Sequence, residues 1–251
     1  MEIHFLGTNG WHDSETGETP CVLIDAEEAY VVLDAGNALR KIDRHITDPE
    51  KPIFLFLSHF HLDHVIGLHA LYKFDFRQGL RIYGQPGTVA ALDRLLAKPF
   101  GAPLRLISEK YPVSAADLPE GRNSVGRIPV ETRYLVHADP CFGYSLTLEG
   151  KKITYCTDTG SCPSMVELAK GADLLITECA WKKRNQYPGW PHLAPEDAAD
   201  AAKASGAKRL VLMHFDAVNF TTHAEREEAR KRAASIYTPV TAAEDDMVLS
   251  L

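Results

Sequence analysis

The chain has 251 residues, of which 45% are hydrophobic and 24% charged, a composition that excludes a disordered or fibrous protein. Its net charge of −7 argues against a protein that wraps long nucleic acid. Apolar runs of about five residues are too short to cross a bilayer, and the first residues lack a secretory pattern. Five cysteines without a CxxC pair favour reduced thiols. We therefore expect a cytoplasmic protein with one domain, residues 1–251, and no membrane partner.

Strand signals recur along the whole chain, with helical signals between them. A first strand over residues 1–6 is followed by β-branched or aromatic segments at 21–25, 30–33, 53–57, 80–83, 127–136, 144–148, 152–156, 174–177 and 209–213. Apolar spacing, acidic first turns and a capping box at Thr222 predict helices over 63–74, 86–96, 195–205 and 222–236. This alternation indicates a layered α/β protein.

The most informative segment lies directly after the apolar run 53–57. His59 and His61 are two residues apart on extended chain, so their side chains point to the same side and can share a metal ion. Asp63 and His64 follow where the chain turns into a helix and can face a second ion. Imidazole and carboxylate ligands suit Zn, Mn or Fe. Solvated histidines on a loop are the alternative interpretation, but three histidines and an aspartate so close together favour a metal site.

Three further candidate ligands follow other apolar strands. His137 comes after residues 134–136, Asp158 after 153–156, and His214 after 210–213. Open α/β sheets place their sites at the carboxyl ends of strands, so we expect these side chains to meet the first four.

In this order, HxHxDH at 59–64, His137, Thr157-Asp158-Thr159-Gly160 and His214 resemble the metallo-β-lactamase superfamily. The resemblance implies an αββα sandwich, two mixed sheets face to face with helices outside. It also implies two divalent metal ions, with Zn expected and Mn or Fe as alternatives, and a hydroxide between them. Carried over by position, His59, His61 and His137 hold the first ion. Asp63, His64 and His214 hold the second, and Asp158 bridges both.

A further histidine narrows the branch of the superfamily. The segment 191–199 around His192 resembles the additional histidine motif of ribonuclease Z-like phosphodiesterases, including phosphoribosyl cyclic phosphate phosphodiesterases. This implies that His192 contacts the phosphate and assists the leaving oxygen, while Asp63 also orients the attacking water. A purely structural His192 is the alternative.

Only 20 residues lie between His137 and Asp158, too few for the long arm of ribonuclease Z. Cys21 stands alone where phosphonate-pathway enzymes cluster cysteines around a structural zinc.

The expected function is hydrolysis of a small or cyclic nucleotide-like phosphodiester. The segment 180–190 mixes aromatic and basic residues, so Trp181, Lys182 and Trp190 are candidate substrate contacts, with a solvated loop as the alternative. A carboxylic ester, lactone or thioester hydrolase using the same ions is the main competitor. Transfer RNA 3′ processing and non-catalytic metal binding are weaker ones. The expected partner is a small-molecule substrate, and the sequence leaves a homodimer open.

Overall fold

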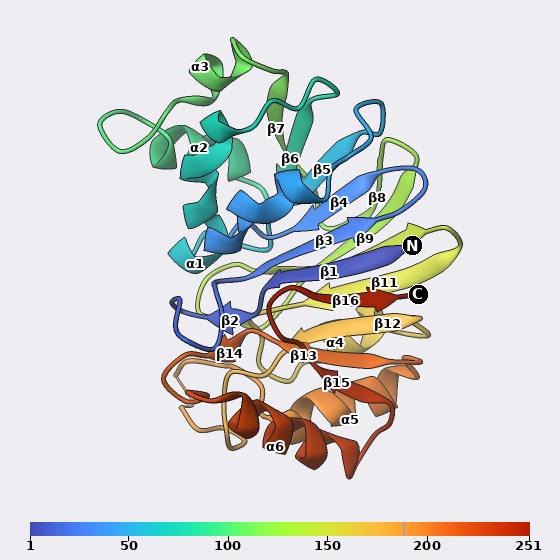
Figure 1. The fold of residues 1–251 in the computed structure, drawn as a ribbon. Coiled ribbons are helices and arrows are strands. Elements are labelled where there is room, and N and C mark those ends of the chain that lie inside the picture. The colour runs from blue at the N-terminus through green and yellow to red at the C-terminus, as the bar shows by residue number, and fades with distance from the viewer. Residues whose placement is uncertain (188) are drawn as a thin grey trace.

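The computed structural model describes residues 1–187 and 189–251, and two seven-stranded mixed sheets dominate it (Figure 1). In spatial order, the first sheet consists of β16 (Met247–Ser250), β1 (Glu2–Gly7), β3 (Cys21–Asp25), β4 (Tyr30–Leu33), β5 (Ile53–Phe56), β6 (Leu80–Gly84) and β7 (Val113–Asp117). The second consists of β15 (Val240–Ala242), β13 (Leu210–Met213), β12 (Leu174–Glu178), β11 (Lys151–Cys156), β10 (Phe142–Leu148), β9 (Ile128–Tyr134) and β8 (Gly121–Val125).

Helices cover the outer face of each sheet. Those over the first sheet are η1 (Asn37–Arg44), α1 (Leu62–Val65), η2 (Ile66–Lys73), α2 (Thr88–Leu95) and α3 (Leu104–Ser108). Those over the second are α4 (Pro163–Leu168), α5 (Pro195–Ser205) and α6 (His223–Ala234). The two sheets pack face to face with a core between them. The expected αββα sandwich is therefore confirmed.

The alternation of side chains along the strands explains why whole strands are apolar. In β5, Phe54 and Phe56 face the core between the sheets, whereas Ile53 and Leu55 face the core under the helices. In β13, Val211 faces the core between the sheets. A strand buried on both faces reads as a continuous apolar run rather than an alternating one.

The central strands were predicted well from the sequence, and the edges of the sheets were not. The bounds of β3, β4 and α5 match the prediction, and α6 starts at the predicted capping box on Thr222. The edge strands β7 and β8 were missed because their partly exposed residues show little apolar patterning. The helix predicted over 63–74 is one α-helical turn followed by 3-10 helix. The helix predicted from 86 begins later, at Thr88, because Gly87 before it is left-handed.

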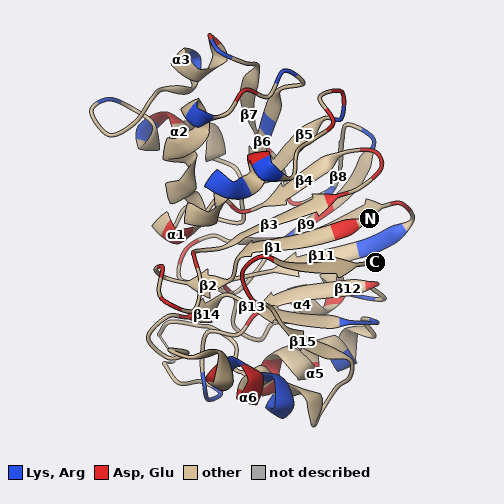
Figure 2. Cartoon of the chain, in the orientation of Figure 1, with Lys and Arg blue, Asp and Glu red and all other residues tan. Residues whose placement is uncertain are grey.

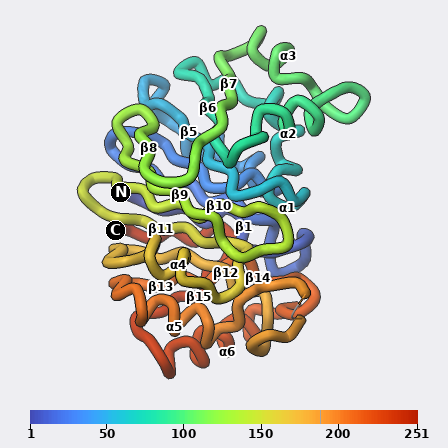
Figure 3. Tube along the Cα trace, turned by 180° about the vertical axis from the view of Figure 1, so that it is seen from behind, coloured from blue at the N-terminus to red at the C-terminus, as the bar shows by residue number. Residues whose placement is uncertain are grey.

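A short parallel pair links the two halves near the strand ends. β2 (Asn9–Gly10) pairs with β14 (Phe215–Asp216), which directly follows β13 and His214. Seen from behind, the two chain ends lie side by side on the paired strands β1 and β16 (Figure 3). Among the described residues, no helix combines the length and apolar character needed to cross a bilayer.

Candidate metal centre

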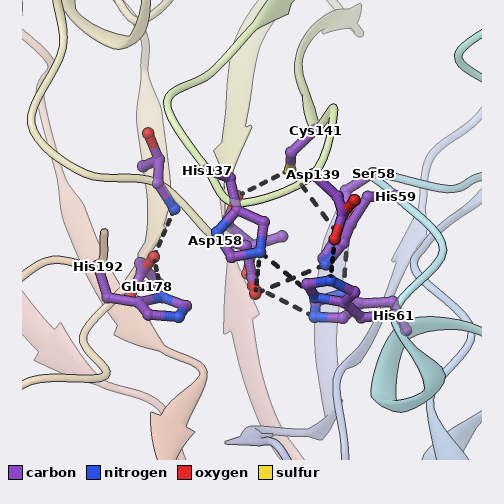
Figure 4. A network of polar contacts seen from close by, with 12 residues as sticks. Ser58, His59, His61, His137, Asp139, Cys141, Asp158, Glu178 and His192 are labelled. Carbon is purple, nitrogen blue, oxygen red and sulfur yellow. Dashed lines mark hydrogen bonds and ion pairs between the residues drawn. The ribbon is translucent and has the colours of Figure 1, made fainter. Parts of the chain in front are cut away.

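Four side chains from both sheets converge at one end of the sandwich (Figure 4). His59 and His61 follow β5 of the first sheet, while His137 and Asp158 follow β9 and β11 of the second. One potential ligand atom from each of the four lies within 4.8 Å of the others. The Oδ2 atom of Asp158 is 3.7 Å from Nε2 of His59 and 3.6 Å from Nε2 of His137.

A second cluster lies on the other side of the same aspartate. Asp63, His64 and His214 place their ligand atoms within 4.8 Å of one another. Oδ1 of Asp158 is 3.2 Å from Nε2 of His64 and 3.0 Å from Nε2 of His214. The two carboxylate oxygens of Asp158 therefore face two different clusters, as a bridging ligand requires.

The spacing of these atoms fits divalent cations. Ligands bonded to a tetrahedral ion at 2.0–2.1 Å are about 3.3 Å apart. The Nε2 atom of His59 is buried and has no hydrogen-bond partner among the described residues. A buried polar atom without a partner is costly, and a cation in the cluster would satisfy it. The donor set, imidazole nitrogens and carboxylate oxygens, suits Zn, Mn or Fe.

The electrostatics of the clusters also favour cations. Burial alone would raise the pKa of Asp158, but His214, His64 and His59 hold it well below its usual range. Burial would likewise raise the pKa of Asp63, and His64 and His214 lower it. Burial would lower the pKa of His64, yet Asp63, Asp158 and Asp34 hold it well above its ordinary value. Ionised carboxylates thus concentrate negative charge where cations would bind.

The far nitrogens of three candidate ligands have hydrogen-bond partners that orient the rings. Nδ1 of His64 contacts Oδ2 of buried Asp34 at 2.8 Å, and Asp34 also accepts hydrogen bonds from Tyr155 and Ser58. Ser58 Oγ is 3.0 Å from Nδ1 of His59. Nε2 of His61 is 2.9 Å from Asp139, which leaves Nδ1 of His61 toward His137. Such outer contacts fix which ring nitrogen is free to bind a metal.

Asp34→Asn is expected to lower metal affinity about 10- to 100-fold, the usual effect of losing a carboxylate behind a histidine ligand. The amide cannot accept the hydrogen bonds from His64, Tyr155 and Ser58 with a full negative charge. Competition with a chromophoric chelator measures the change. Asp139→Asn is the matched comparison, and its effect should be smaller because Asp139 is 65% exposed at its side chain. Equal losses of metal affinity in the two variants would contradict the role of buried Asp34 in orienting His64.

Three residues of the centre have unusual backbone conformations. Asp34, Asp158 and His214 follow strands with φ of 59°, 52° and 50°. The left-handed region costs a residue with a side chain roughly 1–2 kcal/mol. Strain of this kind persists where the surrounding structure enforces it, and it clusters at functional sites. Here it turns each side chain sharply from the strand end into the centre.

Gly10 packs directly against a ligand candidate. A Cβ atom at this position would lie 2.5 Å from Cε1 and 2.6 Å from Nδ1 of His214. Gly10→Ala is therefore expected to displace the His214 ring and to lower affinity at the second cluster by about tenfold or more. Metal titration followed by elemental analysis should show one tightly held ion rather than two, with the cluster around His59 as the internal control. Two ions held as tightly as in the unmodified chain would contradict this packing argument.

His192 lies beside both clusters and is held by a buried carboxylate. Its Nδ1 is 2.8 Å from Glu178 Oε1, and its ring lies 5.2 Å from that of His137 and 6.1 Å from that of His214 between centroids. Burial alone would lower the pKa of His192, but Glu178 raises it to about 9. Glu178 also accepts hydrogen bonds from backbone N–H groups, those of Thr159 and Leu193 among them. The Glu178 carboxylate thus favours the protonated form of the His192 imidazole.

A cavity of about 580 Å³ opens over these residues. It is lined by Gly10, Trp11, His61, Leu62, Asp63, Asp158, Ala180, Trp181, Trp190, His192, His214 and Asp216. The predicted contacts Trp181 and Trp190 are therefore part of its wall. Lys182 is not. Its ammonium group forms an ion pair with Glu225 of α6 and lies over the ring of Phe220, and substrate binding by Lys182 stays a prediction.

The seven metal-ligand candidates predicted from the sequence come together in the structure, and His192 lies beside them. Asp34 and Trp11 are among the residues of the site that were not predicted. Asp34 follows β4 just as His214 follows β13, so the same strand-end pattern could have found it. Trp11 gave no comparable signal, because its place depends on a loop that folds back from a distant part of the chain.

Comparisons with known proteins agree with this architecture. Residues 22–215 match the family model of the β-lactamase superfamily domain. An uncharacterised protein of Mycobacterium tuberculosis is 29% identical over 195 residues, covering 74% of this chain and 69% of the relative. Ribonuclease Z of Pyrococcus abyssi is 25% identical over 266 residues, covering 85% and 86%.

Two solved structures share the fold. The metallo-β-lactamase fold protein YhfI from Bacillus subtilis superimposes with a TM-score of 0.80 at 20% identity, covering 99% of this chain and 98% of that one. A diphosphatase from the PhnP family superimposes with a TM-score of 0.77 at 17% identity, covering 100% and 97%.

Proposed function

The chain belongs to the β-lactamase superfamily, and from this premise we propose that it is a dinuclear metal-dependent phosphodiesterase for a small or cyclic nucleotide-like substrate. The observation that carries the proposal is the sharing of Asp158 between two ligand clusters, with His192 on the wall of the same cavity. Relatives named ribonuclease Z and a diphosphatase of the PhnP family support chemistry at phosphorus.

Each side chain has a distinct task in this proposal. Two cations held by the clusters would stabilise charge on the phosphoryl oxygens and activate a water molecule as nucleophile. Zn is expected in both positions, with Mn or Fe as alternatives. Asp63 receives a hydrogen bond of 2.8 Å from the backbone N–H of Trp11, which holds its carboxylate in place both as a ligand and to orient that water.

His192 would act as the general acid. Glu178 holds Nδ1, so Nε2 is the nitrogen that can meet a substrate oxygen. The leaving oxygen of a phosphodiester gains negative charge as its bond to phosphorus breaks, and an imidazolium can donate a proton to it. The alkoxide that leaves an ester or lactone needs a proton as well, so the relatives named ribonuclease Z, rather than the His192–Glu178 pair, favour phosphorus over a carbonyl carbon.

A small substrate fits the chain better than transfer RNA. The segment between His137 and Asp158 forms β10 and β11, joined by a tight turn at Glu149 and Gly150. No inserted arm occupies this part of the described chain. Basic residues are spread over the molecule, and on α6 they alternate with acidic ones (Figure 2). In this view, acidic and basic segments of the described chain are interspersed, and no broad basic patch stands out for a long polyanion.

The test is turnover of bis-p-nitrophenyl phosphate by protein reconstituted with Zn²⁺ or Mn²⁺, beside p-nitrophenyl esters and lactones. We expect diester cleavage well above ester cleavage, and loss of turnover after chelation. Ester or lactone turnover without diester cleavage would overturn the proposal and assign the site to carbonyl chemistry. Inactivity with every metal and substrate would point to a binding protein instead.

A further inference from the structure

Two exposed indole rings flank the metal centre on different sides. The ring of Trp190 is stacked on that of His61, with centroids 5.8 Å apart and an interplanar angle of 8°, and it meets the ring of His137 edge-on. The backbone of Trp11 binds Asp63 of the other cluster. Both tryptophans line the cavity, and Trp190 is 45% exposed and Trp11 65%. Each ring therefore keeps free surface for a ligand.

The backbone of Trp11 shows that its position is enforced. Its φ of 72° is left-handed, which is unusual for a bulky residue. The loop around it is anchored to α6, because the guanidinium of buried Arg226 on that helix donates hydrogen bonds to Thr8 and Thr16 at 2.9 Å. A large apolar side chain held at the mouth of a cavity in a costly conformation points to a role in binding.

The charges of the cavity wall point to the type of ligand. None of the described residues that line the cavity is a lysine or arginine. Two basic residues of the neighbouring loop have other partners, since Lys182 pairs with Glu225, and Arg184 pairs with Asp197 and Asp200. Asp216 adds a carboxylate to the wall. Apart from the metal centre and His192, the wall therefore offers a ligand aromatic surface rather than positive charge.

We propose that Trp11 and Trp190 select a phosphodiester that carries one flat aromatic ring and one phosphate group, with the ring stacked on indole and the phosphate at the histidines. Aromatic side chains bind nucleobases through such stacking and tolerate any base. A substrate with several phosphates would find no further cations on the wall. This inference rests on the proposed phosphodiesterase function and names its substrate class.

The test compares two diesters that differ only in the ring. The probes are 3′,5′-cyclic AMP and a methyl riboside 3,5-cyclic phosphate, which has a methoxy group in place of the base. Replacing Trp190 or Trp11 by leucine should raise KM for cyclic AMP by about tenfold or more, and should leave KM for the base-free diester unchanged. Trp190→Phe should restore most of the affinity. Phe100→Leu is the matched control, because Phe100 is 84% exposed but lies outside the cavity lining.

A binding measurement keeps this inference separate from the proposed function. The chain has three tryptophans, so quenching of indole fluorescence by adenosine 5′-monophosphate can be followed with and without metal. Quenching that is weakened in the leucine variants supports stacking, even if no diester is cleaved. Equal KM for the two diesters in the unmodified chain, or equal losses for both in the variants, would overturn the inference. Absence of quenching that depends on Trp11 or Trp190 would overturn it as well.

Discussion

Asp158→Ala should remove metal from both clusters at once and lower kcat/KM by about 10³-fold or more. Loss of one group that stabilises a transition state electrostatically costs about 10²–10³-fold, and here the surroundings of two ions change together. The reason is geometric: Oδ2 of Asp158 faces His59 and His137, while Oδ1 faces His64 and His214. Elemental analysis after gel filtration measures the metal, and diester turnover measures the activity.

Asp139→Ala is the matched control for Asp158→Ala. It also removes a carboxylate next to a ligand histidine, but the one polar partner of the Asp139 side chain among the described residues is His61, at 2.9 Å, and Asp139 is largely exposed. It should retain both ions and most of the activity. An Asp158→Ala protein that kept two tightly bound ions would show that the aspartate does not bridge them.

His192→Ala should lower turnover about 10²–10⁴-fold while metal content stays unchanged. His192 contacts Glu178 rather than belonging to either ligand cluster, so its loss removes a proton donor and leaves the metal ligands in place. The loss should be larger for a diester with an alkoxide leaving group than for bis-p-nitrophenyl phosphate. The nitrophenolate anion is stable and leaves without a proton, whereas an alkoxide needs one.

This difference between leaving groups separates an acid from a structural residue. If the substitution His192→Ala disrupted the loop instead, turnover of both diesters would fall by the same factor, or the protein would lose metal. Glu178→Gln is the companion variant, because it keeps the size of the side chain and removes the charge that holds His192. It should reproduce part of the loss of turnover. The loss should again be smaller for bis-p-nitrophenyl phosphate than for the diester with an alkoxide leaving group. Equal slowing of both diesters in the two variants would remove His192 from the role of acid.

The sequence was sufficient for the ligand clusters because four of the ligand candidates come shortly after the end of a strand, and the other three lie close to His59 in the same segment. Once β5, β9, β11 and β13 are recognised, His59, His137, Asp158 and His214 are expected at neighbouring strand ends. Their roles as metal ligands stay predictions, although the distances fit them. The family model and the solved structures confirm the fold predicted from the same motifs.

Tertiary contacts were harder to predict than strand ends. Lys182 stands among aromatic and basic residues, so its sequence context suggested a ligand contact, but α6 supplies Glu225 as its partner. Trp11 and Trp190 lie far apart in the chain, and only the folded loops bring both to one cavity. The edge strand β8 was missed because an edge strand with polar residues carries no clear apolar period.

The origin of the ligands in two different sheets has a consequence for cohesion of the molecule. His59, His61, Asp63 and His64 belong to the half built on β5, whereas His137, Asp158 and His214 belong to the half built on β9, β11 and β13. Ions bound between them would act as cross-links between the halves, and their binding free energy would add to the free energy of unfolding. At 100 times the dissociation constant a single ion contributes about 2.7 kcal/mol. The melting temperature should therefore rise with metal concentration, and a chelator would loosen the sandwich from this end first.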